Sequence, residues 1–512
     1  MSSVTLPRDS NQALGIGQYA LDFLRDGKPS QKVLARTKLF HTDALLCGLS
    51  ALSLQTNAPT LLRKEALEYP DEHGATCFGS NALVKPEKAI VANCAAVREW
   101  DSNGTNFGYR PELGHTAGEF GHNDFYPVVI AACQQRGLDG AVALRAMVML
   151  DEIRGRLAEV FSLKTYKIDH VVHGAIASAA TYGALMEATA EQIESAIGMF
   201  VAHHIPWRAI RAGKQLSDSK GASAAISTEA AILCMKRSMA GFVGPKDIFR
   251  NPESMFRQFI RTDGASPFDL VLSMDGDDFA VMGMHFKLGL YEHQSAGALQ
   301  GVIDLIARHP EILEPGAIQK IVIKAYEPAF GIIGDPAKRN PTTRQSADHS
   351  MVYIVSRLLR KAIYREERML PPLEKDLTSD DLWCFLMLTP FDYSPEALAD
   401  PKTRAIMSRI EFEHGGPEYD AQYPEGIPTS VVITTTAGST LDSGLVMFPA
   451  GHARNTTADL EKILEIKFAM LATMAADHFS SEDLDRLEAL DEMSAQDLGR
   501  VYNIAIAQRD FE

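Results

Sequence analysis

The sequence predicts a mostly α-helical protein with a smaller α+β lid, because helical patterns fill both ends of the chain and strand patterns occur only between them. Its 512 residues are 46% hydrophobic and 23% charged, which suits a globular enzyme with two or three cores. We place the first part of a helical domain at 1–283, the lid at 284–451 and the second part of the helical domain at 452–512. The last segment has too little apolar surface to fold alone, so we expect it to pack on the N-terminal helices.

The stretch 146–160 has the period of an amphipathic helix. Its apolar residues recur at steps of four and three: Ala146, Leu150, Ile153, Leu157 and Val160. Thr189 and Gln192 form the pattern of a capping box, which predicts a second amphipathic helix from that point. The stretches 173–186 and 222–239 are rich in Ala, Gly and Ser, which favours buried helices in close contact.

Strand patterns appear only after about residue 275. Residues 321–324 read as a short strand, and residues 431–436 and 445–448 read as the two strands of a hairpin. Helical pattern returns at Asp459. The middle of the chain is therefore expected to be the α+β lid.

Charge and composition exclude several classes of function. A formal net charge of -16 argues against a nucleic-acid partner, which would require a basic surface. We find no membrane span, signal peptide or Arg-rich transit peptide, so we expect a cytoplasmic protein, or one of the mitochondrial matrix if the source is eukaryotic. An anionic substrate would have to meet a local basic pocket.

A polar segment between two apolar stretches is the strongest indication of a site. Asp101, Thr105 and His122 supply a carboxylate, a hydroxyl and an imidazole in sequence that forms loops. A single loop histidine is more often a solvated bystander, but three catalytic residue types around one insertion favour a site.

Three further segments carry candidate residues. His170 stands at the start of the small-residue helix, where it could face a ligand or simply cap the helix. Arg208, Arg211 and Lys220 follow in a basic segment, which could grip carboxylates or form a solvated turn. The third group comprises Lys287, His293 and His349, at the domain change and in the lid.

The chain lacks the local motifs of several cofactor sites. It contains no zinc-protease histidine pair, no dinucleotide or Walker glycine loop and no serine-hydrolase elbow, and its six cysteines form no Cys-x-x-Cys pair. We therefore expect acid–base chemistry without a metal or cofactor, acting on a small polyanion.

The ordered set of motifs resembles the MmgE/PrpD family over residues 15 to 480. The segments that carry the resemblance are 39–52 (LFHTDALLCGLSAL), 97–105, 121–122, 168–171, 208–220, 286–293, 348–349 and 451–454. The resemblance implies a homodimer with a large all-helical domain and an α+β lid. Members include 2-methylcitrate dehydratase, cis-aconitate decarboxylase and iminodisuccinate epimerase, which act on small polycarboxylates without metal.

The resemblance also implies the site residues. The catalytic set carried over from the decarboxylase branch is Asp101, Thr105, His122, His170, Lys220 and Lys287. Candidate substrate-binding residues are Arg208, Arg211, His293 and His349. A histidine, His122 or His170, would remove the proton, cations would stabilise the enediolate, and Asp101 would orient a histidine or protonate the departing hydroxyl.

Two features favour a dehydratase within this family. A tyrosine of the decarboxylase branch falls near Phe330 here, and a phenyl ring cannot donate a proton. Tyr326, four residues earlier, is the alternative occupant of that position. The pair Arg208 and Arg211 resembles the Leu-Arg-x-x-Arg stretch of 2-methylcitrate dehydratases. The segment from Thr105 to His122, however, is longer than in those dehydratases, which predicts an altered pocket wall.

The expected function is dehydration of 2-methylcitrate or a related hydroxy-polycarboxylate to the cis-alkene. Decarboxylation of cis-aconitate and epimerisation of a small dicarboxylate are the alternatives within the family. A pseudoenzyme or binding protein on the same scaffold is the alternative outside enzyme chemistry.

Overall fold

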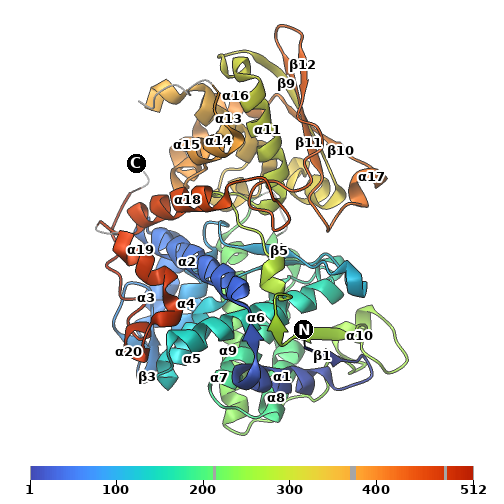
Figure 1. Cartoon of the computed structure of the whole chain (residues 1–512), viewed down its shortest axis with the longest axis vertical. Coiled ribbons are helices and arrows are strands. Elements are labelled where there is room, and N and C mark those ends of the chain that lie inside the picture. Colours follow the sequence, from blue (N-terminus) through green and yellow to red (C-terminus); the bar gives the residue numbers. More distant parts are fainter. Residues whose placement is uncertain (1, 212–214, 369–375, 478–480, 511–512) are drawn as a thin grey trace.

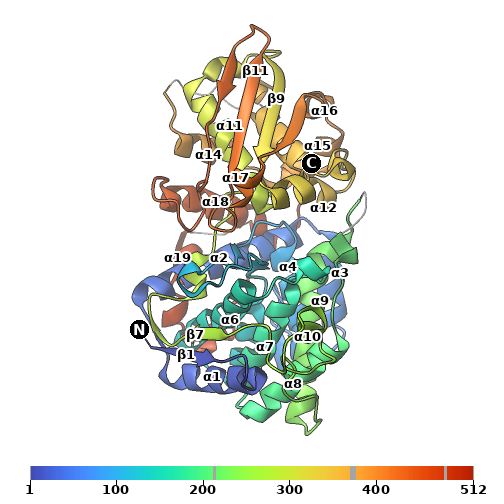
Figure 2. The same cartoon turned by 90° about the vertical axis from the view of Figure 1, so that its right-hand side faces the viewer.

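The computed structural model describes residues 2–211, 215–368, 376–477 and 481–510. A large helical domain and a smaller α+β domain lie one above the other (Figures 1 and 2), as the sequence predicts. In the described ranges, every helix is too short or too polar to cross a lipid bilayer.

Helix α7 (Val171–Leu185) lies at the centre of the helical domain, and all of its residues are buried. It packs against α6 (Gly140–Val160), α8 (Ala190–His203) and α9 (Asp218–Met239). Small residues allow this closeness: a Cβ on Gly174 would lie 1.9 Å from the Phe125 ring. The surrounding helices are α1 (Gln12–Asp26), α2 (Gln31–Ser53), α3 (Asn57–Ala66), α4 (Pro86–Arg98), α5 (Tyr126–Arg136) and α10 (Met255–Phe259).

The local helix signals are confirmed. The apolar stripe of 146–160 lies within α6, and its residues are buried apart from the terminal Val160. Helix α8 begins with the expected capping box, in which Thr189 Oγ1 accepts from the Gln192 amide at 3.2 Å. Gln192 Oε1 in turn accepts from the Thr189 amide at 2.9 Å. Two orphan amides at the helix start are thereby satisfied.

The upper domain is built on a four-stranded sheet of order β10-β9-β11-β12. Its strands are β9 (Ile318–Ala325), β10 (Ile410–His414), β11 (Thr429–Thr435) and β12 (Thr440–Asp442). Strand β10 is parallel to β9, whereas β11 is antiparallel to both β9 and β12. The accompanying helices are α11 (Ala296–Arg308), α12 (Arg344–Ala347), α13 (Met351–Ile363), α14 (Ser379–Leu386), α15 (Pro395–Ala399), α16 (Pro401–Met407) and α17 (Pro417–Asp420).

The predicted hairpin is wrong in its second strand. Strand β11 pairs with β12 at 440–442, and residues 445–448 make only an isolated bridge at Val446. The hydroxyl oxygen of Ser443 accepts from the Val431 amide at 2.8 Å, and Gly444 then turns the chain with φ +74°. The apolar run 445–448 still lies beside the start of β11, where Thr429 and Val446 exchange backbone hydrogen bonds of 2.8 and 3.0 Å, but it forms no continuous strand.

The C-terminal segment packs on the helical domain. Helix α18 (Leu460–Ala475) lies along α2 and also touches α14 of the lid (Figure 1). Helix α19 (Ser481–Glu488) packs on α2, and α20 (Ala495–Leu498) packs on α5. The exact domain boundaries at 283 and 451 stay a prediction.

Candidate active site

The polar segment that follows α4 is buried, not solvated. Asp101, Ser102 and Asn103 are all fully buried. Asp101 adopts φ +52°, a left-handed conformation that costs roughly 1–2 kcal/mol for a residue with a side chain. The antiparallel pair β5 (Thr105–Phe107) and β6 (Phe120–His122) then places Thr105 opposite His122. Local backbone geometry therefore gathers three of the predicted residues.

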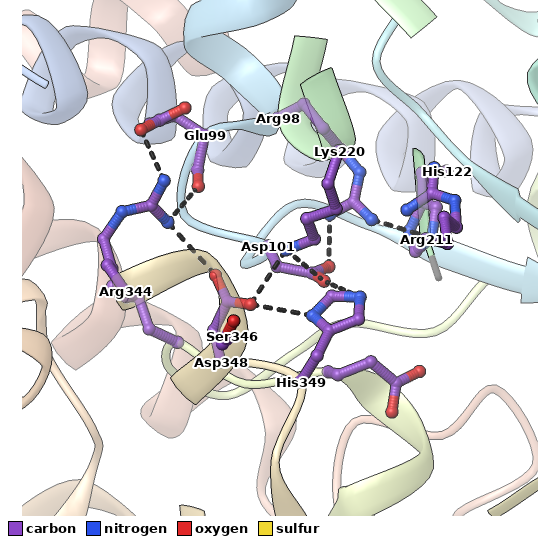
Figure 3. Close-up of polar contacts among 12 residues, drawn as sticks. Arg98, Glu99, Asp101, His122, Arg211, Lys220, Arg344, Ser346, Asp348 and His349 are labelled. Carbon is purple, nitrogen blue, oxygen red and sulfur yellow. Dashed lines mark hydrogen bonds and ion pairs between the residues drawn. The ribbon is translucent and has the colours of Figure 1, made fainter. Parts of the chain in front are cut away.

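The Asp101 carboxylate lies among cations, of which Arg98 and Lys220 are labelled in Figure 3. It accepts hydrogen bonds from Arg98 and Lys287. Its Oδ2 lies 3.5 Å from Lys220 Nζ and 3.2 Å from His349 Nε2. Burial alone would raise the pKa of Asp101, but the surrounding cations hold it well below its usual range. Asp101 is therefore an anion in this site.

A second carboxylate, Asp348, continues the network. Its Oδ1 accepts from Lys220 at 2.8 Å and lies 2.7 Å from His349 Nδ1. Arg344 joins Asp348 to Glu99, as Figure 3 shows. Four carboxylates are thus balanced by four cations: Glu99, Asp101, Asp124 and Asp348 against Arg98, Lys220, Lys287 and Arg344.

The only candidate group of metal ligands in the described residues lies inside this network. Asp101, Asp348 and His349 could offer three ligand atoms within 4.8 Å of one another. Lys220 and Lys287 already neutralise those carboxylates, and a divalent cation would be repelled by them. The donor set therefore does not fit a metal ion.

The predicted cations Lys220 and Lys287 lie behind the cavity wall. Both are almost fully buried, and each contacts a carboxylate. Burial lowers the pKa of Lys287 to about 8, although Asp101 opposes that shift. Contact with Asp101 favours a positioning role for these lysines over direct contact with substrate carboxylates.

A cavity of about 40 Å³ lies between the two domains. The helical domain contributes Arg98, Thr105, Phe107, Phe120, His122, His170, Arg208 and Arg211. The lid contributes Glu292, Gln294, Ile332, Ile333, Lys338 and His349. A cavity of this size holds only a few water molecules, so a tricarboxylate requires the domains or side chains to move apart.

Two neutral histidines face this cavity, with ring centroids 5.1 Å apart. Burial, the largest effect, holds the pKa values of His122 and His170 well below the usual range. Arg98 Nη2 lies 3.2 Å from His122 Nε2 and can only donate, which assigns the His122 proton to Nδ1. His170 Nδ1 lies 3.5 Å from Asp169 Oδ1, and His170 Nε2 has no hydrogen-bond partner in the described residues. His170 is thus the better placed proton acceptor.

The two predicted arginines behave differently. Arg211 donates to both oxygens of Asp169, at 2.5 and 3.2 Å, and holds the pKa of that carboxyl below its usual range against the effect of burial. Arg208 Nη1 is buried and has no hydrogen-bond partner among the residues described. A buried, unpartnered guanidinium nitrogen beside the cavity is suited to receive a substrate carboxylate.

Sequence reasoning missed the three other charged residues of the lining, Arg98, Glu292 and Lys338. Burial raises the pKa of Glu292 to about 7 and lowers that of Lys338 to about 8. Lys338 forms no ion pair within 4 Å in the part of the chain that the structure describes. Glu292 directly precedes the predicted His293, and Arg98 is the last residue of α4, just before the polar segment. Both could therefore have been predicted as sequence neighbours of candidate residues. No local signal marks Lys338.

The remaining predicted residues lie close to the cavity in different ways. Thr105 lines it, and the Thr105 hydroxyl donates to the Gly121 carbonyl at 2.8 Å. His293 stacks on His285 at 4.9 Å, beyond the ring of Phe107, and is not part of the described lining.

The Phe330 argument against a tyrosine near the site fails. Phe330 packs beside His414 at 5.6 Å, outside the cavity lining. Tyr326 instead is buried, and its hydroxyl has no hydrogen-bond partner in the described residues. Burial raises the pKa of Tyr326 well above its usual range, and the Glu292 charge raises it further. Neither ring is among the described residues that line the cavity, so the choice between the two reactions does not rest on Phe330.

Comparisons with known proteins agree with the fold class. The chain is 25% identical to the mitochondrial 2-methylcitrate dehydratase of Yarrowia lipolytica, over 92% of this chain and 86% of that protein. It is 23% identical to the 2-methylcitrate dehydratase of Escherichia coli, over 87% of each chain. It is 24% identical to the alkylcitrate dehydratase phiI of a fungal species, over 85% of this chain and 82% of that protein.

Family models match both ends of the chain. The MmgE/PrpD N-terminal domain covers residues 16–267, and the MmgE/PrpD C-terminal domain covers residues 385–495. Together they span most of the helical domain and the second half of the lid with its return to helix. The chain therefore belongs to the MmgE/PrpD family.

Proposed function

We propose that this protein is a hydro-lyase that dehydrates 2-methylcitrate or a related hydroxy-polycarboxylate to the cis-alkene, without a metal ion. The names of its relatives support the reaction class. The single observation that carries the assignment is the cavity itself, which holds neutral histidines, a carboxyl with a raised pKa and two cations, Arg208 and Lys338, that form no ion pair with described residues.

His170 acts as the base. Its Nε2 takes the proton from the carbon next to a carboxylate, while the Asp169 carboxylate, 3.5 Å from Nδ1, stabilises by its charge the imidazolium that forms. Arg211 fixes Asp169 in turn. The carboxylate beside the reacting carbon gains charge as the proton leaves, and Arg208 and Arg98 stabilise the enediolate.

Glu292 acts as the acid. With a pKa near 7, a substantial fraction of its carboxyl groups is protonated at neutral pH. The electron pair left on carbon forms the double bond as the carbon–oxygen bond breaks, and the departing hydroxide takes the Glu292 proton and leaves as water. The His170 proton then returns to Glu292 through solvent, which completes the cycle.

Turnover of 2-methylcitrate tests this proposal directly. Purified protein should generate the ultraviolet absorbance of the conjugated alkene from 2-methylcitrate, with and without a chelator. His170→Asn should abolish it, while His73→Gln, at an exposed histidine far from the cavity, should leave it unchanged. Absence of any alkene from the wild-type protein would reject the dehydratase assignment and leave the pseudoenzyme alternative.

Decarboxylation of cis-aconitate is the second candidate, and Tyr326 is the observation that favours it. A carbanion left by carbon dioxide needs a proton, and a buried phenol near Glu292 could deliver one. Incubation with cis-aconitate, followed by mass spectrometry for itaconate, separates the two reactions. We keep dehydration first because the relatives that we compare are all named dehydratases.

We also propose that the protein works as a homodimer, on the family resemblance, and that it resides in the cytoplasm or the mitochondrial matrix. Sedimentation equilibrium at micromolar concentration tests the first point, and imaging of a tagged chain in its own cells tests the second.

A further inference from the structure

The cavity between the domains is lined by apolar as well as polar and charged residues. The apolar ones are Phe107, Phe120, Ile332 and Ile333, in a lining whose other members are all polar or charged. A polycarboxylate without a substituent has no group to place against such residues. The apolar part of the lining therefore requires an explanation beyond the acid–base chemistry.

The β5–β6 pair places this surface next to the reacting groups. Thr105 pairs with His122, and two residues further along Phe107 pairs with Phe120. Side chains two residues apart point to the same face of a strand and are separated by about 7 Å. All four of these residues line the cavity. The aromatic pair thus lies about 7 Å along the strands from Thr105 and His122, and the His122 ring lies 5.1 Å from that of His170, the proposed base.

The lid supplies the other two apolar residues of the lining, and both belong to a π-helical turn. Residues Ala329–Ile333 form a single π-helical turn, and its consecutive residues Ile332 and Ile333 both line the cavity. Single π turns are frequent at functional sites, because they redirect side chains that an α-helix would point elsewhere.

The aromatic part of this surface is held rigidly. Phe107 and Phe120 meet edge to face at 5.6 Å, and Phe107 also contacts Tyr423 at 5.6 Å. Lys164 Nζ lies 4.4 Å from the Phe120 ring. Tyr423 donates to the Gly118 carbonyl at 2.6 Å, which ties the segment between β5 and β6 to the lid. A surface fixed from several sides can select a substituent by size.

We propose that Phe107, Phe120, Ile332 and Ile333 form an alkyl subsite, which binds the substituent on the substrate carbon that loses its proton, and that Phe120 limits its length. This inference rests on the proposed dehydratase function. The substrate class is then a 2-alkylcitrate with a short chain, and unsubstituted citrate is a poor substrate. One methyl group in an apolar pocket changes kcat/KM by roughly 10- to 200-fold.

Rates with three substrates test the subsite. The wild-type protein should favour 2-methylcitrate over citrate by at least tenfold in kcat/KM, and should turn over 2-butylcitrate poorly. Phe120→Ala should raise the ratio of 2-butylcitrate to 2-methylcitrate turnover at least tenfold, and Phe120→Leu should raise it less. Phe242→Ala, at an exposed phenylalanine, is the matched control and should leave the ratios unchanged.

The outcomes separate this inference from the proposed function. Dehydration of citrate and 2-methylcitrate at rates within threefold, or ratios that do not change in Phe120→Ala, would overturn the subsite and keep the dehydratase. If the wild-type protein turns over none of the three, titration calorimetry with the same compounds decides. Tighter binding of 2-methylcitrate than citrate, lost in Phe120→Ala, would support the subsite, and equal binding would overturn it.

Discussion

Replacement of Asp101 by Asn removes the carboxylate at the centre of the buried ion network while keeping its shape. Asp101 is fully buried and contacts Arg98, Lys287 and Lys220. The change leaves the network with one more cation than carboxylates. Breaking a buried pair by removing one partner costs about 3–5 kcal/mol, so we expect a loss of that size in the free energy of unfolding.

The loss in the free energy of unfolding should lie at the lower end of this range, because Lys287 can give up its proton. Asp101 is the largest influence that raises the Lys287 pKa, which lies at about 8. Without it the pKa falls further, so Lys287 releases its proton more readily, at a cost of about 1.4 kcal/mol per pKa unit. The double variant Asp101→Asn, Lys287→Met should therefore recover at least about 2 kcal/mol of the loss.

Thermal denaturation at pH 7 measures both effects. The entropy of unfolding is about 2.1 cal/mol/K per residue, so a loss of about 3 kcal/mol in a chain of 512 residues lowers Tm by about 3 °C. Asp477→Asn, at an exposed partner of Arg509, is the control and should cost less than about 1 kcal/mol. The pKa of Asp101 is depressed in the folded state, so the difference from wild type should be complete above about pH 4 and disappear as the pH falls through the folded value.

Two results would refute this reasoning. A free energy of unfolding for Asp101→Asn within about 1 kcal/mol of the wild-type value would mean that the Asp101 carboxylate does not stabilise the folded state. A double variant as unstable as the sum of the two single variants would mean that Asp101 and Lys287 do not act on each other.

Glu292→Gln should lower kcat by roughly 10²- to 10⁴-fold, since it removes the proposed acid. In the wild type, kcat should fall as the pH rises through about 7, because Glu292 loses its proton there, and the variant should lack that descending limb. Arg208→Ala should lower kcat/KM by about 30- to 1000-fold, which corresponds to about 2–4 kcal/mol, whereas Arg261→Ala at an exposed arginine should have no effect. Lys220→Ala should lower kcat/KM and Tm together, and an active, stable variant would remove Lys220 from the site.

The candidate site was predictable where its residues lie close together in sequence. The polar segment after α4 contains Asp101 and Thr105, and the β5–β6 pair brings His122 back to it. His170 was recognisable because it begins a helix of small residues. Lys338 gave no signal, because its pKa and position depend on burial beside Glu292 in a different element.

The alignment of Phe330 shows where motif reasoning is weakest. Tyr326 and Phe330 are four residues apart, about one helical turn, and a π turn begins between them. A sequence pattern cannot tell which of the two aromatic rings is buried. The structure assigns the buried position to Tyr326, and neither ring is among the described residues that line the cavity.

The chain's apolar periodicity, its small-residue stretches and its capping signals were sufficient for the fold class, because these are local properties that act within one helix or strand. The burial of charged residues could not be read from local sequence. Asp151 and Glu152 pair with Arg154 and Arg156 three and four residues away on α6, but all four are buried only because other elements pack around the helix. Lys287 meets Asp101 across 186 residues, and Lys220 meets Asp348 across 128. A buried charge is stable only beside its partner, and that partner is brought near by folding, so such roles emerge only once the helical domain and the lid have packed together.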